Sequence, residues 1–184
     1  LLRDAFGYVS LAPANAIHVG DRHYPVSLIA GSIPVFVAPH TLCLDDPDPC
    51  FAIAGSGSRK KSAFQLAQEL LNASPDHLWA LVTNGRQLRL LRDAATLTRP
   101  SFLEIDLQDI LAGARYAEFA NTWRLLHASR GGIAPADTQT NNTASCIWEA
   151  WRETGQQEGT RVRDGLRQGV TEDLLIFGEG FLQN

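Results

Sequence analysis

The sequence predicts an α/β fold in which helices flank a mixed sheet, followed by a C-terminal helical connector. Three observations predict this fold. Short apolar segments separated by turn-forming pairs fill the first part of the chain, an amphipathic helical pattern follows, and an Asn-Gly pair then joins two strand-like segments. Because strands and helices alternate along the chain, a mixed α/β arrangement is favoured over a pure β barrel. With 184 residues, 45% of them hydrophobic, the chain is long enough to bury a core.

The N-terminal part is expected to be mostly strands. Leu1 to Leu11 is a short amphipathic opening that predicts a helical turn, and Gly20-Asp21 and Gly31-Ser32 mark two turns. Strands are predicted at Ile17–Val19, Tyr24–Ala30, Ile33–Ala38 and Phe51–Ala54.

A helix and a hairpin form the centre of the predicted fold. Ser62 and Gln65 have the spacing of a capping box, and the apolar stripe that follows predicts a helix ending at Asn72–Pro75. Leu78–Val82 is an apolar run typical of a strand covered on both faces. Asn84-Gly85 then predicts a type I′ turn into an alternating strand that carries several arginines.

Two helices and a strand follow the hairpin. Ser101–Asp106 alternates like a strand, and Asp106 is placed to cap a short helix over Leu107–Leu111. Apolar residues at three- and four-residue spacing predict a longer helix over Tyr116–Ser129. His127 lies on that apolar stripe, which favours a half-buried histidine over a metal ligand.

The domain organisation is predicted from a change in composition. Residues 131–145 are rich in Gly, Pro, Thr and Asn, as in a linker, so we expect an α/β domain over 1–130 and a helical connector over 146–184. Gly155, Gly159, Gly165 and Gly169 weaken the connector helix by up to about 1 kcal/mol each. This helix is therefore expected to need a partner surface.

Charge and cysteine content restrict the location and the partners. The formal net charge is −4, so any contact with nucleic acid must come from a local basic patch. The three cysteines do not suggest a disulfide framework, and no apolar run approaches the roughly 20 residues that span a bilayer. We expect a cytoplasmic protein with no membrane partner. The absence of methionine suggests an excerpt of a longer chain.

Two loops contain residues that could bind a metal ion or a phosphate group. Residues 40–50 contain His40, Cys43 and Cys50, with Asp45, Asp46 and Asp48 between them, but only one knuckle-like pair is present, so an acidic surface loop is favoured over a metal site. Residues 55–61 (GSGSRKK) satisfy neither the GxxxxGK[ST] nor the GxGxxG pattern. A turn with a basic tip is the favoured interpretation, and such a tip can still contact a phosphate backbone.

Known catalytic patterns are absent from the sequence. Nucleases of the restriction-endonuclease fold use an Asp and a Glu-x-Lys pair to hold a metal ion and orient water, yet no acid stands two residues before Lys60 or Lys61, the only lysines. There is no GxSxG motif, and no two prolines are adjacent, so an Asn-Pro-Pro-aromatic methylase loop is excluded from these residues. No catalytic residue is therefore predicted.

Several segments together resemble the N-terminal, nuclease-like region of adenine-specific DNA methyltransferases from restriction-modification and phage-defence systems, including type IIG, phage-growth-limitation and DISARM enzymes. These segments are RHYPV (22–26), FQLAQELLN (64–72), HLWALVTNGRQLRLLRDAATLTRP (77–100), NTWRLLHASR (121–130) and VRDGLRQGVTEDLLIFGEGFL (162–182). The resemblance implies a degenerate restriction-endonuclease-like fold without catalytic residues. It also implies a methyltransferase domain beyond Asn184, which would bind S-adenosylmethionine; no cofactor is expected in this chain.

The leading hypothesis is a noncatalytic module that binds DNA and packs on a methyltransferase core or another defence-system subunit. Six basic residues near the glycine-rich loop and the hairpin are the expected phosphate contacts: Arg59, Lys60, Lys61, Arg86, Arg89 and Arg99. An alternative is an active metal-dependent nuclease with carboxylates from Asp45, Asp46 or Asp48. Another is a pure assembly domain that docks a partner subunit through Trp148 and Trp151.

Overall fold

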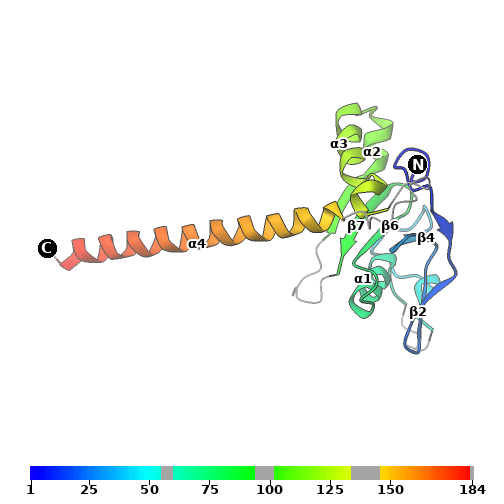
Figure 1. Ribbon diagram of the computed structural model, residues 1–184, viewed down its shortest axis with the longest axis horizontal. Coiled ribbons are helices and arrows are strands. Elements are labelled where there is room, and N and C mark those ends of the chain that lie inside the picture. The colour runs from blue at the N-terminus through cyan, green and yellow to red at the C-terminus, as the bar shows by residue number, and fades with distance from the viewer. Residues whose placement is uncertain (55–59, 94–101, 134–145, 183–184) are drawn as a thin grey trace. The chain divides into compact units, whose positions relative to one another are not determined.

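The computed structural model describes residues 1–54, 60–93, 102–133 and 146–182. The chain divides into two compact units, residues 1–145 and 146–184. The first unit is a mixed α/β structure, which confirms the predicted class at that level (Figure 1). Its strands are β1 (Ala12–Pro13), β2 (Ala16–Val19), β3 (Arg22–Pro25), β4 (Leu28–Ala30), β5 (Ile33–Val37), β6 (Trp79–Thr83), β7 (Gln87–Arg92) and β8 (Phe102–Asp106). Its helices are η1 (Pro49–Phe51), α1 (Ala63–Ala73), α2 (Leu107–Ala112), α3 (Tyr116–Leu126) and η2 (Ala128–Gly131).

Six strands form one sheet in the order β1-β4-β5-β6-β7-β8, and β2 and β3 pair separately. Among the described strands, β5 and β6 make the one parallel pairing, and α1 is the crossover between them. The other neighbours are antiparallel. The sheet is therefore mixed, as predicted.

The central strands are covered on both faces. Phe36, Val82 and Arg89 lie side by side across β5, β6 and β7, on the face that packs on α1. The next row of side chains along the strands, which includes Leu81 and Leu90, points to the opposite face of the sheet and is also buried. β6 is almost wholly apolar because both of its faces are buried.

Local signals placed α1 and α2 correctly. The capping box at the start of α1 is present in both directions, with Gln65 N donating to Ser62 Oγ (3.1 Å) and Ser62 N donating to Gln65 Oε1 (3.2 Å). Asp106 caps α2 by accepting from Asp109 N at 2.9 Å. Both caps satisfy helix donors that would otherwise have no partner.

Two strand predictions are wrong. The segment Tyr24–Ala30 is divided between β3 and β4, which belong to different sheets, and Pro25, which has no N–H to donate, ends β3. The segment Phe51–Ala54 begins instead within η1, because Pro49 suits the first turn of a helix and Asp48 caps it. Ala54 makes only an isolated bridge, to His23.

The hairpin forms with a turn different from the predicted type I′. Gly85 has a φ of +82°, but Asn84 is not among the residues with positive φ. Instead, the Asn84 Oδ1 accepts from Arg86 N (3.0 Å) and Gln87 N (2.8 Å). The asparagine side chain thus closes the turn that its backbone was expected to make.

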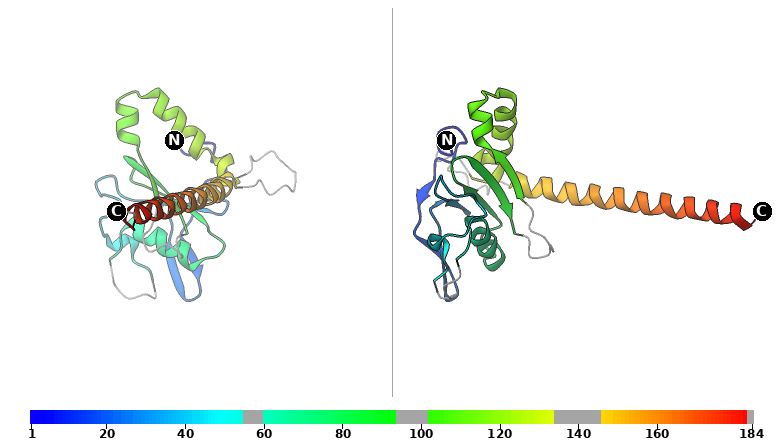
Figure 2. Two further views of the ribbon diagram at one scale, coloured as in Figure 1. Left: turned by 90° about the vertical axis from the view of Figure 1, so that its left-hand side faces the viewer. Right: turned by 180° about the vertical axis from the view of Figure 1, so that it is seen from behind.

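The helix predicted over Tyr116–Ser129 ends at Leu126. Residues near and after this end make hydrogen bonds with the N-terminal segment. His127 has an extended ψ of 138°, and Ala128 N donates to Phe6 O at 2.8 Å. Trp123 Nε1 donates to Ala5 O (2.7 Å), and the buried Tyr8 donates its hydroxyl hydrogen to Leu126 O (2.9 Å). Figure 2 shows the N-terminal segment beside the α2–α3 end of the unit.

The second unit contains one helix, α4 (Ile147–Leu182). It begins at the residue where the sequence predicts helix, and its 36 residues include all four glycines noted above. Within the described ranges, no helix combines the length and the hydrophobicity that a bilayer-spanning segment requires.

Candidate functional site

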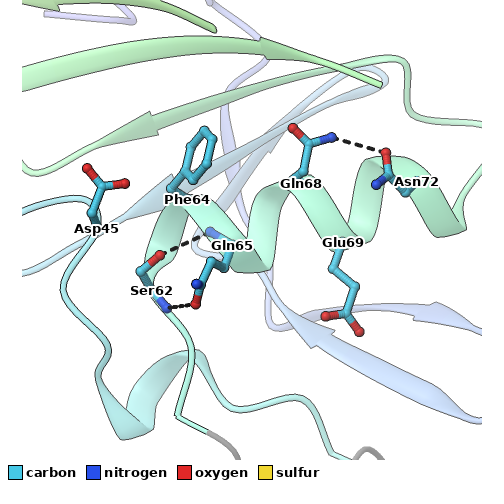
Figure 3. Close-up of a pocket in the computed structure, with 7 residues that line it drawn as sticks. All are labelled: Asp45, Ser62, Phe64, Gln65, Gln68, Glu69 and Asn72. Atoms are coloured by element: carbon cyan, nitrogen blue, oxygen red, sulfur yellow. Dashed lines mark hydrogen bonds between the residues drawn. The ribbon is translucent and has the colours of Figure 1, made fainter. Parts of the chain in front are cut away.

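A polar pocket of about 460 Å³ lies along α1. Its residues come from α1, from the N-cap of that helix and from the preceding loop (Figure 3). The lining residues are Asp45, Ser62, Phe64, Gln65, Gln68, Glu69 and Asn72.

Hydrogen bonds already fix most of the polar groups in this pocket. Ser62 and Gln65 bind each other in the capping box, and Gln68 Nε2 donates to Asn72 Oδ1 at 3.0 Å (Figure 3). Glu69 pairs with Arg22 at 3.2 Å and with Lys61. The Gln68 Oε1 is buried without a hydrogen-bond partner among the described residues. Most polar groups of the pocket are thus occupied by contacts within the protein, and its lining contains no histidine to act as a base for Ser62.

Arg89 lies beside this pocket, and its guanidinium is bound by two carboxylates and packs on two aromatic rings. Its guanidinium donates to both carboxylate oxygens of Asp45, at 2.7 Å each, and to Glu104 at 2.5 Å. The same group lies 5.2 Å from the Phe64 ring centroid and 4.5 Å from that of Phe102. Arg89 is only 6% exposed. A bidentate carboxylate and two ring faces are favourable surroundings for a guanidinium.

This environment changes the protonation of the pair. The hydrogen bond from Arg89 lowers the pKa of the Asp45 carboxyl, and the hydrogen bond to Asp45 raises the pKa of the Arg89 guanidinium. Both groups are therefore held in their charged forms. Arg89 was predicted to contact a DNA phosphate, but its charge is neutralised here by two carboxylates and its side chain is buried. It does not have the free, exposed position that such a contact needs.

The other predicted DNA contacts differ in their surroundings where the structure describes them. Lys61 is partly buried against Glu69, and Arg86 donates from Nε to Gln108 Oε1 at 2.7 Å. Lys60 is exposed. Arg59 and Arg99 lie outside the described residues.

The acidic loop is held together by contacts within the protein. Asp46 accepts from Cys43 N (3.0 Å) and Asp48 accepts from Cys50 N (2.9 Å), while Asp45 binds Arg89. No group of three potential metal ligands occurs among the residues that the structure describes. Burial, with help from the Asp48 carboxylate, raises the pKa of the Cys50 thiol to about 11. At neutral pH this cysteine is a thiol, whereas metal binding and nucleophilic attack need a thiolate.

The sequence contained one usable signal for the Arg89 cluster. An arginine between Leu88 and Leu90, on a strand flanked by strands, must be paired if both faces are covered. Its partners Asp45 and Glu104 are 44 and 15 residues away, so their identity required the folded structure.

Comparison of the chain with protein-family models, with curated proteins and with solved structures gives no match. Functional inference therefore depends on the residues and their geometry.

Proposed function

We propose that this chain is a noncatalytic module for DNA binding and assembly in a cytoplasmic adenine-specific DNA methyltransferase system. The α/β unit is a degenerate relative of the restriction-endonuclease fold, and α4 is the element through which the module associates. S-adenosylmethionine belongs to the methyltransferase domain of such a system and not to this chain. The methyltransferase context is supported by five segments that resemble the N-terminal region of adenine-specific DNA methyltransferases. These segments are residues 22–26, 64–72, 77–100, 121–130 and 162–182.

The exposed apolar row of α4 is the single observation that carries the assembly role. Val162, Leu166, Val170 and Leu174 are between 57% and 67% exposed. Most of the stability of protein helices comes from packing an apolar face, so a 36-residue helix with six glycines and an exposed apolar row needs a partner.

The noncatalytic assignment is supported by the strands themselves. Metal-dependent nucleases of the restriction-endonuclease fold carry their acidic residues and lysine on neighbouring strands. Strands β4 (LIA) and β5 (IPVFV) contain no charged residue. The acidic residues of β8 are Glu104, which binds Arg89, and Asp106, which caps α2, and the neighbouring strand β7 (QLRLLR) contains no lysine. The acidic side chains of the nearby loop are bound to Arg89 or to backbone N–H groups.

For DNA binding, Lys60 and Arg86 are the predicted contacts that the structure describes as exposed. Arg86 is bound to Gln108, whereas Lys60 stands next to Arg59 in sequence and is the contact chosen for the test. The variant Lys60→Glu is expected to weaken binding to duplex DNA and to reduce the slope of log K against log salt by about 0.9, the value for one phosphate contact. Fluorescence anisotropy over a series of salt concentrations measures both quantities.

The matched control is Arg124→Glu, which makes the same charge change at an exposed position of α3. It changes the net charge equally but lies outside the predicted contacts, so it should keep the wild-type slope. Equal effects of the two variants would show that only net charge matters and would overturn the role of Lys60.

A further inference from the structure

Four of the exposed apolar residues of α4 form one ridge with regular spacing. Val162, Leu166, Val170 and Leu174 follow one another at intervals of four residues, so they lie along one side of the helix. This ridge is symmetrical about Gln168. If two copies of α4 run antiparallel and cross at Gln168, Val162 of one lies beside Leu174 of the other, and Leu166 beside Val170.

The glycines of α4 fit the same arrangement. A Cβ added at Gly159 would meet no atom within 4 Å, so nothing in the described chain requires a glycine there, although glycine weakens a helix. In the antiparallel pair, Gly159 lies opposite Phe177, whose side chain is 68% exposed. With 3.6 residues per turn, Gly159 and Phe177 project from the same face of the helix as the ridge. A missing side chain facing a large ring is a complementary contact, and it occurs twice in a symmetrical pair.

Charges along α4 also favour an antiparallel pair. Arg161 and Arg163 precede the centre of the ridge, whereas Glu172 and Asp173 follow it, and all four are exposed. The antiparallel arrangement brings Arg163 near Asp173 of the second copy, and both side chains project on the side of the ridge. Arg161 and Glu172 project on the opposite side of the helix and take no part in the pairing. A parallel pair in register would instead place Asp173 beside its own copy, which is repulsive.

The existing contacts of these residues do not oppose the pairing. Arg161 binds Glu158 at 3.2 Å within its own helix, but both side chains are highly exposed, so this pair contributes little. The remaining acidic residue of the region, Asp164, projects about 0.4 of a turn away from Val162 and from the centre of the ridge.

From these observations we propose that α4 binds α4 of a second copy of this chain, antiparallel, with the two-fold axis at Gln168. This inference deepens the assembly role proposed above by naming the partner. It accounts together for the symmetrical ridge, the unneeded glycine opposite an aromatic residue, and the opposite charges on the two sides of the centre.

The first test is sedimentation equilibrium of the full chain and of two glycine variants. Gly159→Ala and Gly165→Ala should both raise helix content by circular dichroism, since a Cβ at either position meets open space. Only Gly159→Ala should weaken the dimer, by about tenfold or more, because its methyl group takes the room of Phe177 from the second copy. Gly165 projects about a third of a turn from the ridge and serves as the matched control.

The second test is a charge exchange. Arg163→Asp and Asp173→Arg are each expected to raise the dimer dissociation constant, and the double variant is expected to restore it. A wild-type chain that stays monomeric at micromolar concentrations would overturn the second copy as the partner. A dimer that the double variant fails to restore would overturn the antiparallel register.

These outcomes are separable from the DNA-binding role. A monomer that still binds DNA with a dependence on Lys60 would overturn self-association and leave DNA binding supported. A dimer that shows no such dependence would support self-association and overturn the role of Lys60.

Discussion

Replacing Arg89 with alanine is expected to lower the free energy of unfolding by about 2 to 4 kcal/mol. The side chain is almost fully buried, and its removal leaves a cavity beside the contacting rings of Phe64 and Phe102. The change also removes the donors that hold the Asp45 loop and the edge strand β8 to the sheet. Urea unfolding followed by tryptophan fluorescence measures the loss.

Two variants distinguish packing from charge at this position. Arg89→Met keeps most of the side-chain volume that packs against the two rings and should lose less stability than Arg89→Ala. Asp45→Asn should have a small effect, under about 1 kcal/mol, because the Asp45 side chain is 62% exposed and water screens its charge. If Arg89→Ala were as stable as the wild type, the cluster would have no structural role.

The same pair predicts a dependence of stability on pH. The pKa of Asp45 is lowered in the folded state, so its contribution is present above the unfolded value of about 3.9 and is lost as the pH falls through the folded value. The stability difference between the wild type and Asp45→Asn should therefore shrink as the solution is acidified below about pH 4. A difference that grew on acidification would contradict the assigned direction.

The variant Gly7→Ala is expected to destabilise the first unit by roughly 2 to 3 kcal/mol, through strain in two places. Gly7 has a φ of +76°, where an L side chain is strained, and a Cβ there would lie 2.6 Å from His127 Nε2. The ring cannot move freely, because His127 Nδ1 is hydrogen bonded to Ser129 and the next residue is tied to Phe6. Thermal unfolding of the full chain measures the effect.

Gly20→Ala is the matched control for Gly7→Ala. Its φ of +58° causes the same kind of backbone strain, but no atom lies within 4 Å of the added Cβ. We expect a loss of only about 1 kcal/mol. Equal losses at the two positions would mean that contact with His127 contributes nothing.

The elements that the sequence predicted well are those determined by local signals. The capping box at Ser62, the cap at Asp106 and the apolar run of β6 each depend on residues a few positions apart, and each has the expected structure. Two of the errors are local: Pro49 and Asp48 start η1 where a strand is predicted, and the Asn84 side chain closes the hairpin turn. The other errors arise where distant contacts decide. The division between β3 and β4 depends on pairing with different sheets, and α3 ends where Ala128 binds Phe6.

The candidate site was harder to predict for the same reason. In the sequence, Lys60, Lys61 and Arg89 are equally plausible DNA contacts because all three are basic. In the structure, Lys60 is exposed, Lys61 is paired with Glu69, and Arg89 is buried between two carboxylates. The sequence does not predict the pocket on α1, because its lining combines residues of the helix with Asp45 from the preceding loop. Pairing between distant charges leaves no periodic pattern in a sequence.

A combined DNA-binding and cleavage assay on the full chain tests the central claim most directly. Labelled duplex DNA is incubated with the protein, with and without magnesium, and both mobility and length are measured. A noncatalytic DNA-binding module should retard the DNA at low salt, release it as salt rises, and leave it intact in magnesium. Magnesium-dependent cleavage that disappears in Asp46→Ala would contradict this account and establish the acidic loop as a nuclease site.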